Sequence, residues 1–553
     1  MKTDRARTAD RVFADMHREL RAWNPDIPES PERLDPILRI MLKLYADQLA
    51  DIDRRISRTW EMAEDALVRS LSPGNRRCPV PAHTVMRCLP LDPIVEVDPH
   101  TRFYYRERRE GAKALFFSSL RKETILAAKT VGVFAHLSDG LFDLSPGSAG
   151  APPAAAGVPP AGDCDRLYLA VESDGPASNF GGTTVFIDAP AAAARQLSWA
   201  KWYPSSGSGP FYEDAGFTPG LTGGLEAALN RENRPVDWGG LRTSNDVFPN
   251  LRDNFAVIPQ EFADTWQPGP IDPSLLAVMN RVGQNPATAS GDYYWLRLDL
   301  PPGGDRHHLI DLRGIYFDAF LVVNKNEQTL FKHTGGNRLV ELELPDPVDA
   351  ILDVVAVIDS DGRDYMPAHR IQADPEVRYY SLEERENKLV LWFDYSGMVD
   401  NPPDSLTVTY AVTAGVDANG VAAGQITDLY ENHPGVDRAE NLVPVVGAVP
   451  ARTEAEIRTE AAVRLRGRDR ALTFDEIANW AMTFDPRLES VTCENGIERA
   501  EHGVRRCIVV RAQAQPDSLL SDDEASLLAD RLTVFLKSRT PVNTQFRVEL
   551  VRS

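Results

Sequence analysis

The sequence has few features of a secreted, membrane or nucleic-acid-binding protein. Its five cysteines are scattered and form no CxxC pair, which indicates reduced thiols rather than a disulfide framework. No apolar run approaches the roughly 18 residues that a membrane helix needs, and the start, MKTDRARTADRVF, lacks the apolar core of a signal peptide. The formal net charge of -21 disfavours generic binding of nucleic acid. We therefore expect a cytoplasmic protein with no direct membrane span and no nucleic-acid partner.

The motifs of common catalytic sites are also missing. The sequence contains no GxxxxGK[ST] loop, no GxGxxG after a strand and no HExxH. The segment from Asp359 to Asp364 has the spacing of half a calcium loop, but Arg370 stands where the closing glutamate belongs, so a turn is the favoured interpretation. We expect no enzyme activity, no catalytic residue, no metal and no cofactor.

The longest regular pattern in the sequence spans residues 34–71. Its apolar residues recur at steps of three and four, which is helical periodicity. Asp35 can cap a helix and Pro36 suits its first turn, while Ser72-Pro73-Gly74 ends it. The helix predicted over 36–71 would be roughly 54 Å long at 1.5 Å per residue. The proposed interface residues on its apolar stripe are Leu38, Met41, Tyr45, Leu49, Ile52, Ile56, Trp60, Ala63 and Leu67.

An apolar stripe of this length needs a long partner. The shorter pattern at Val12, Met16 and Leu20 would cover about a third of it. An ordinary intramolecular bundle is one interpretation of the stripe. The interpretation that we favour is a bundle completed by other chains.

The rest of the chain changes character several times. Strand-like runs separated by turns predict β-rich structure, and helical patterns with capping boxes return after residue 451. The fold class expected is multidomain α+β, with an N-terminal long-helix bundle, a β-rich middle and a C-terminal two-layer domain. The predicted divisions are a helical region at 1–72, an extended or β segment at 73–144, a flexible Pro/Ala/Gly loop at 145–162, a β-rich middle with long loops at 163–420, a linker at 421–450 and an α+β association domain at 451–553.

The C-terminal domain is predicted in more detail. Capping boxes at Thr453, Thr473 and Ser521 start three helices, which we expect on one face of a small antiparallel sheet in a ferredoxin-like domain. The apolar residues expected between the two layers are Leu488, Val491, Ile508, Val510, Phe546, Val548 and Leu550 from strands, and Val463, Ile477, Trp480, Leu528, Leu532 and Phe535 from helices. The cations Arg464, Arg466, Arg468 and Arg470 lie at a helix C-terminus and the loop after it, where we expect a solvated or protein-facing cluster.

Two separated stretches resemble one superfamily. The segments DPILRIMLKLYADQLADIDRRISRTWEMAEDALVRSLSP, PVPAHTVMRCLP and DPHTRFYYRERREGAKALFFSS resemble the start of the type VI secretion baseplate subunit TssF, and FLVVNKNEQTL and ILDVVAVIDSDG are similar to its middle domain. The segment NLVPVVGAVPARTEAEIRTEAAVRLRGRDRALTFDEIANWA and the last strand resemble the baseplate J family of contractile phage tails. Residues 140–290 match neither family.

The resemblance implies a wedge protein of a contractile injection system, of the type VI, extracellular injection particle, tailocin or phage branch. The partners implied are a second copy of the chain and a second wedge protein similar to TssG, joined through a helical bundle. A sheath initiator, which is a lysozyme-like baseplate protein, and the hub and spike are implied as further partners in a six-fold ring. The localisation implied is cytoplasmic, within a phage-tail-like particle. A β-rich enzyme such as a carbohydrate-active hydrolase, or a surface adhesin, are the alternatives.

Overall fold

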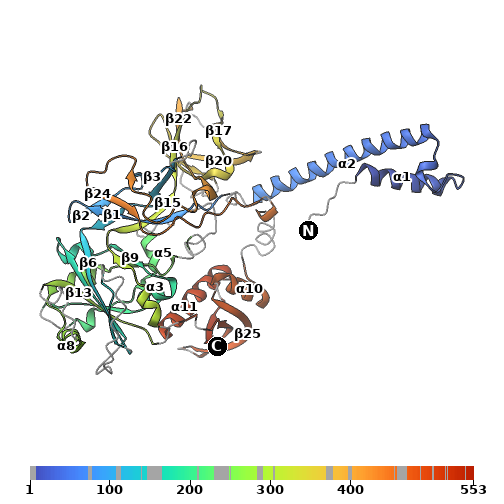
Figure 1. The fold of residues 1–553 in the computed structure, drawn as a ribbon. Helices are drawn as coiled ribbons and strands as arrows, with labels where there is room; N and C mark the ends of the chain where they lie inside the picture. Colours follow the sequence, from blue (N-terminus) through green and yellow to red (C-terminus); the bar gives the residue numbers. More distant parts are fainter. Residues whose placement is uncertain are drawn as a thin grey trace. The chain divides into compact units, whose positions relative to one another are not determined.

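Strands dominate the middle of the chain and helices its N-terminal part (Figure 1). The chain forms two compact units, Met1–Asn75 with Glu454–Arg466, and Arg76–Thr453 with Gly467–Ser553. The fold is mixed α+β with several separate sheets. The structure is a computed structural model and describes residues 8–71, 78–107, 114–138, 140–145, 165–207, 211–229, 248, 251–282, 291–302, 306–368, 378–385, 387–396, 402–453, 455–457, 470–485, 487–500, 503–516, 518–519, 521–541 and 544–552.

The described part of the N-terminal unit contains the long helices α1 (Ala9–Trp23) and α2 (Pro36–Leu71), with the short 3-10 helix η1 (Pro31–Arg33) between them. The Asp35 carboxylate accepts hydrogen bonds from the backbone N–H groups of Ile37 and Leu38, at 2.9 and 3.3 Å. These bonds satisfy donors that a helix N-terminus otherwise leaves unpaired. The helix predicted over 36–71 is therefore confirmed, together with its cap.

A six-stranded sheet joins segments that lie far apart in the sequence. Its strand order is β23-β3-β4-β15-β1-β24, and β1 pairs antiparallel with both β15 and β24. The strands are β1 (His83–Pro90), β3 (Phe103–Tyr105), β4 (Leu115–Ser119), β15 (Ala319–Asn324), β23 (Asp428–Leu429) and β24 (Val436–Asn441). A short hairpin-like pair, β2 (Ile94–Val97) with β5 (Glu123–Leu126), packs its apolar residues into the core on one face of this sheet.

This sheet corrects two predicted divisions. Residues 421–450 are not a linker, because β24 hydrogen-bonds along β1 from Met86 to Pro90. Residues 73–144 are not a separate segment either, because their strands alternate in the sheets with strands from the middle of the chain. The predicted loop at 145–162 lies outside the described residues except for Ser145.

A second sheet forms the largest hydrophobic core with a three-stranded sheet and two helices. Its order is β10-β13-β8-β6-β7, with β12 also on β13, and the smaller sheet has the order β11-β9-β14. The strands are β6 (Ala128–Leu137), β7 (Gly140–Asp143), β8 (Arg166–Ser173), β10 (Lys201–Pro204), β12 (Pro268–Gly269), β13 (Tyr293–Asp299), β9 (Thr184–Asp188), β11 (Phe255–Val257) and β14 (Gly314–Tyr316). The helices of this region are α3 (Ala191–Ser198), α4 (Pro219–Thr222), α5 (Gly224–Leu229), α7 (Gln260–Thr265) and α8 (Pro273–Val282).

Two further sheets enclose one core and form a β-sandwich. The first has the order β16-β22-β18 and the second β17-β21-β20-β19. Their bounds are β16 (Asn326–His333), β18 (Ile351–Asp359), β22 (Ser405–Val412), β17 (Leu339–Pro347), β19 (Tyr365–Pro367), β20 (Arg378–Arg385) and β21 (Lys388–Asp394).

The half calcium loop forms the tight turn that connects β18 to β19 within this sandwich. The Asp359 carboxylate accepts hydrogen bonds from the backbone N–H groups of Asp361 and Arg363, at 2.9 and 3.0 Å. Gly362 has φ +78°, a left-handed conformation that glycine adopts without strain. The interpretation as a turn is confirmed.

The C-terminal domain contains α10 (Phe474–Phe484), β25 (Leu488–Ala500), β26 (Gly503–Ala514), α11 (Asp522–Arg539) and β27 (Phe546–Arg552). Both helices pack on one sheet and share its core, as predicted. The prediction of a purely antiparallel sheet is wrong, because β26 and β27 are parallel. The reason is α11, which carries the chain back across the sheet, as a parallel pair requires. Of the predicted core residues, Val463 lies outside the described residues and all others contribute to the core.

His83 is a buried titratable group in the six-stranded sheet. Its side chain is 1% exposed and its ring meets the edge of Phe248 at 4.8 Å between centroids. Burial lowers the pKa of His83 from 6.5 to about 4. The folded sheet therefore requires the neutral imidazole.

We predict that the second unit loses stability as the pH falls from 6.5 towards 4. In this pH window the unfolded chain takes up a proton at His83, whereas the folded chain does not. The free energy of unfolding therefore falls by about 3 kcal/mol. His83→Leu should flatten this dependence in guanidinium unfolding of the full chain, whatever its effect on stability at pH 7.5. The exposed His333, replaced by leucine, serves as the control. An unchanged pH dependence in His83→Leu would contradict the assignment.

Candidate protein interface

Helix α1 packs on a face of α2 that carries small residues. Ala46 and Ala50 are 1% and 3% exposed and form a core with Val12, while Phe13 and Met16 pack at its edge. Alanines spaced by four residues let a second helix approach closely, because they form a low ridge along α2. The expectation that Val12 and Met16 cover the predicted stripe is therefore wrong, because α1 takes the neighbouring alanine face instead.

The predicted apolar stripe remains open to solvent. Its described members from Met41 onward are about half exposed, whereas Leu38 is partly buried. The exposed fractions are 47% for Met41, 53% for Tyr45, 45% for Leu49, 50% for Ile52 and 52% for Ile56. The side chains of Trp60, Ala63 and Leu67 lie outside the described part of the chain.

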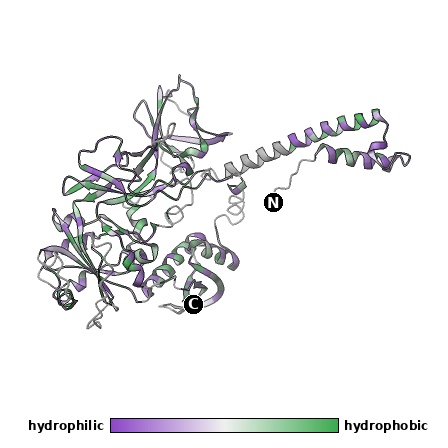
Figure 2. Ribbon diagram, viewed as in Figure 1, coloured by the Kyte–Doolittle hydropathy of each residue, from purple (hydrophilic) through white to green (hydrophobic). Residues whose placement is uncertain are grey.

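Three large apolar residues widen this stripe beyond the prediction. Ile37, Ile40 and Leu44 are 71%, 60% and 58% exposed. Ile37 and Leu44 lie four and three residues from Met41, and Ile40 lies four residues from Leu44. Residues with these spacings are neighbours on a helix surface, so the three extend the same apolar surface. Figure 2 shows hydrophobic residues interspersed with hydrophilic ones along the described part of α2. We call the set Ile37, Ile40, Met41, Leu44, Tyr45, Leu49, Ile52 and Ile56 the open face of α2.

The open face is larger than scattered surface hydrophobics would explain. Single exposed apolar residues are normal on a protein surface, but a contiguous apolar patch marks an interaction site. Its neighbours on the helix are charged, and Asp51 forms ion pairs with Arg54 and Arg55, both at 3.2 Å. An apolar strip bordered by charges has the composition of a helix–helix interface.

Only one arginine of the predicted cluster lies in the described part of the chain. Arg470 is exposed in the segment before α10. Arg464, Arg466 and Arg468 lie outside the described residues, so their clustering stays a prediction.

The described residues contain no group of His, Cys, Asp and Glu side chains suited to a metal ion. A cavity of about 190 Å³ is lined by His100, Arg102, Lys325, Glu327 and Glu431 among others. Its charges neutralise one another, because Glu327 contacts Lys325 at 2.9 Å and His100 at 3.1 Å, and Arg102 contacts Glu431 at 2.6 Å. Burial alone would raise the pKa of Glu327. Hydrogen bonds from Lys325 and His100 nevertheless hold this pKa below its usual range.

None of the described helices is long and apolar enough to cross a membrane. No family profile matches the sequence, and no curated protein matches it. Solved structures do match. One is a chain of the type VI secretion system TssK-TssF-TssG baseplate subcomplex, at 12% identity and a TM-score of 0.53, covering 93% of this chain and 96% of that one.

Two other structures match with lower scores. A chain of the baseplate complex from the type VI secretion system matches at 13% identity and a TM-score of 0.43, covering 99% of this chain and 95% of that one. A chain of the anti-feeding prophage baseplate matches at 14% identity and a TM-score of 0.19, covering 41% and 57%. The fold assignment therefore rests on the first match, which extends over nearly the whole of both chains. The protein has the fold of a chain from the TssK-TssF-TssG baseplate subcomplex, and the resemblance found in its sequence is confirmed at the level of the fold.

Proposed function

We propose that the chain is a structural wedge subunit in the baseplate of a contractile injection system. The observation that carries the proposal is the open face of α2, on a helix of 36 residues. In α2, Leu42, Ala46 and Ala50 are buried, whereas the residues of the open face lack a cover. The fold match to a baseplate chain supports the same conclusion.

The proposed cover for the open face is a helical bundle made with other wedge proteins. A second copy of this chain and one TssG-like wedge protein would supply the remaining helices. Each buried square ångström of apolar surface contributes about 25 cal/mol, so a face built from large aliphatic side chains can hold such a bundle without ion pairs. The sheath initiator and the hub and spike are proposed as further partners of the assembled ring.

The proposed role includes no catalysis. The cavity at His100 has paired charges, and the described residues offer no metal-binding group. A scaffold function also agrees with the cores of the second unit, which are filled by large apolar side chains around each sheet. The place of action proposed is the cytoplasm, within a phage-tail-like particle.

For the C-terminal domain we propose a role in joining wedges into a ring. Its own core and its βαβ connection describe a small domain, which we interpret as a reduced ferredoxin-like fold. The exposed Arg470, and the arginines before it, are proposed to face a neighbouring subunit. A ring repeats one contact between identical copies, so closure strengthens even a modest interface.

The bundle is tested by placing charges on the open face. Ile52→Asp and Ile56→Asp should abolish copurification with the TssG-like wedge protein, because an unpaired charge inside a packed bundle costs several kcal/mol. Both side chains are half exposed in the single chain, so its own fold should survive. The measurement is pull-down from coexpressing cells, with circular dichroism of the purified variants.

Two control substitutions separate the two faces of α2. Arg54→Asp places a charge beside the stripe, at a residue that is 66% exposed, and should leave copurification unchanged. Ala46→Asp should instead detach α1, because Ala46 is buried against it. Copurification that survives both isoleucine substitutions would refute the bundle.

The ring role is tested by removing residues 467–553. The truncated chain should still copurify with the TssG-like protein, because α2 is untouched, but should yield single wedges rather than six-fold rings. Electron microscopy of the assemblies distinguishes the two, and tryptophan fluorescence checks that the middle of the chain stays folded. Intact rings from the truncated chain would assign ring closure to another part.

A further inference from the structure

The contact between the C-terminal domain and the middle of the chain is polar, although both lie in one compact unit. The C-terminal core is built only from residues between Ala471 and Leu550. The other hydrophobic clusters of the described residues take no member from that domain. The contact therefore has no apolar core of its own.

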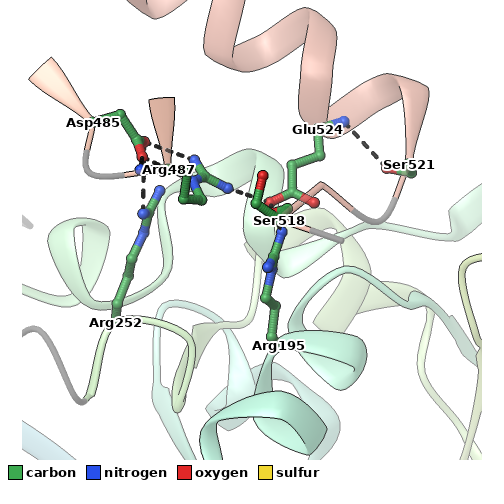
Figure 3. A network of polar contacts seen from close by, with 7 residues as sticks. All are labelled: Arg195, Arg252, Asp485, Arg487, Ser518, Ser521 and Glu524. Carbon is green, nitrogen blue, oxygen red and sulfur yellow. Dashed lines mark hydrogen bonds and ion pairs between the residues drawn. The ribbon is translucent and has the colours of Figure 1, made fainter. Parts of the chain in front are cut away.

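An ion network occupies this contact instead (Figure 3). Arg195 on α3 donates from Nη2 to Glu524 Oε1 at 2.8 Å, and also to the backbone carbonyl of Ser518. Arg252, which precedes β11, lies with Nη1 3.7 Å from Asp485 Oδ2. Two arginines of the middle thus reach two carboxylates of the C-terminal domain.

Arg487 connects the two carboxylates within the C-terminal domain. Its guanidinium donates to both oxygens of Asp485, with Nε to Oδ1 at 2.9 Å and Nη2 to Oδ2 at 2.8 Å, and its Nη1 donates to Glu524. Three arginines and two carboxylates are thus linked across the contact. The buried carboxylate of Asp253, on the middle, adds a third negative charge that attracts all three arginines. A single broken link affects the rest because Glu524 and Asp485 each face two arginines.

The network is strongly desolvated. The side chains of Glu524 and Asp485 are 1% and 7% exposed, and Arg487 and Arg195 are 15% and 19% exposed. Burial alone would raise the pKa of Asp485, but its hydrogen bonds with Arg487 and the nearby Arg252 keep that pKa below its usual range. Burial, followed by repulsion from Arg487, lowers the pKa of Arg252.

We propose that this network is a latch that holds the C-terminal domain in one orientation and lets it undock as a folded unit. Removing charges from water offsets most of the attraction between them, so such a network adds little net stability while it is intact. Loss of one arginine is costly because the buried carboxylate that it faced keeps only part of its compensating charge. The domain keeps its own core, so this cost drives it off the middle rather than unfolding it.

Undocking also restores water to the charges on both sides. Arg195 and Arg252 would become solvated on the middle, and Glu524 would keep Arg487 and its place in the first turn of α11, where an acidic side chain is favourable. Arg531 of α11 would leave a small cavity that it lines with Trp199 and Gly220. Each half of the contact therefore remains stable after separation, which the latch requires. The inference stands independently of the baseplate role.

The test compares three substitutions at Arg195 in the full chain by hydrogen exchange. Arg195→Glu, which faces Glu524, and Arg195→Met, which removes only the charge, should raise exchange in the segment of Ser518 and Leu519, whose backbone Arg195 contacts, by roughly tenfold or more. Arg195→Lys keeps the charge and should retain most of the protection. Amides of β26 around Val510 and Ala512 should stay protected in all three, because they belong to the C-terminal core.

The control is Arg313→Met, since Arg313 pairs with Asp188 at 3.7 Å within the middle of the chain. It should leave exchange at Ser518 and Leu519 unchanged. Small-angle scattering should show a larger radius of gyration for Arg195→Glu than for this control. Unchanged exchange and radius in Arg195→Glu would overturn the latch. Equal loss of protection in β26 would overturn it too, because the domain would then be unfolding rather than undocking.

Discussion

The pairing of β1 with β15 and β24 is the constraint on which the second unit depends. It brings residues near the start of the chain against residues from its middle and from beyond 435. Alternate side chains of β1 then enter two different cores, Met86 and Cys88 on one face and Val85 on the other. The side chains of one strand thus contribute to the cores on both faces of the sheet. A shift of one residue in register would move each of these side chains to the opposite face.

Much of the local structure could be predicted from the sequence. The helix at 36–71 and most of the C-terminal core follow from periodicity and caps. The partners of each strand could not be predicted, because register depends on residues hundreds of positions away. The segment 421–450 looks like a linker because β24, with the sequence VDRAEN, is polar on its exposed positions.

For the candidate interface, too, the local structure could be predicted from the sequence but the packing partner could not. Periodicity identified the stripe on α2, but it could not determine which of two adjacent faces α1 would take. The latch gave no local signal at all. Glu524 follows Ser521 at the spacing of a capping box, and Ser521 does cap α11, yet the Glu524 carboxylate binds Arg195 and Arg487. The latch residues come from four separate segments, around Arg195, Arg252, Arg487 and Glu524, which only the tertiary structure brings together.

The open face of α2 has a consequence for how the chain exists in a cell. A helix that presents isoleucine, leucine and tyrosine to water is what chaperones and proteases recognise in incompletely assembled proteins. Free copies would therefore be open to degradation until a helix of the proposed bundle covers this face. Supply of the covering partner would then set how much of this chain accumulates, so that the ratio of subunits is controlled by degradation of the excess as well as by synthesis.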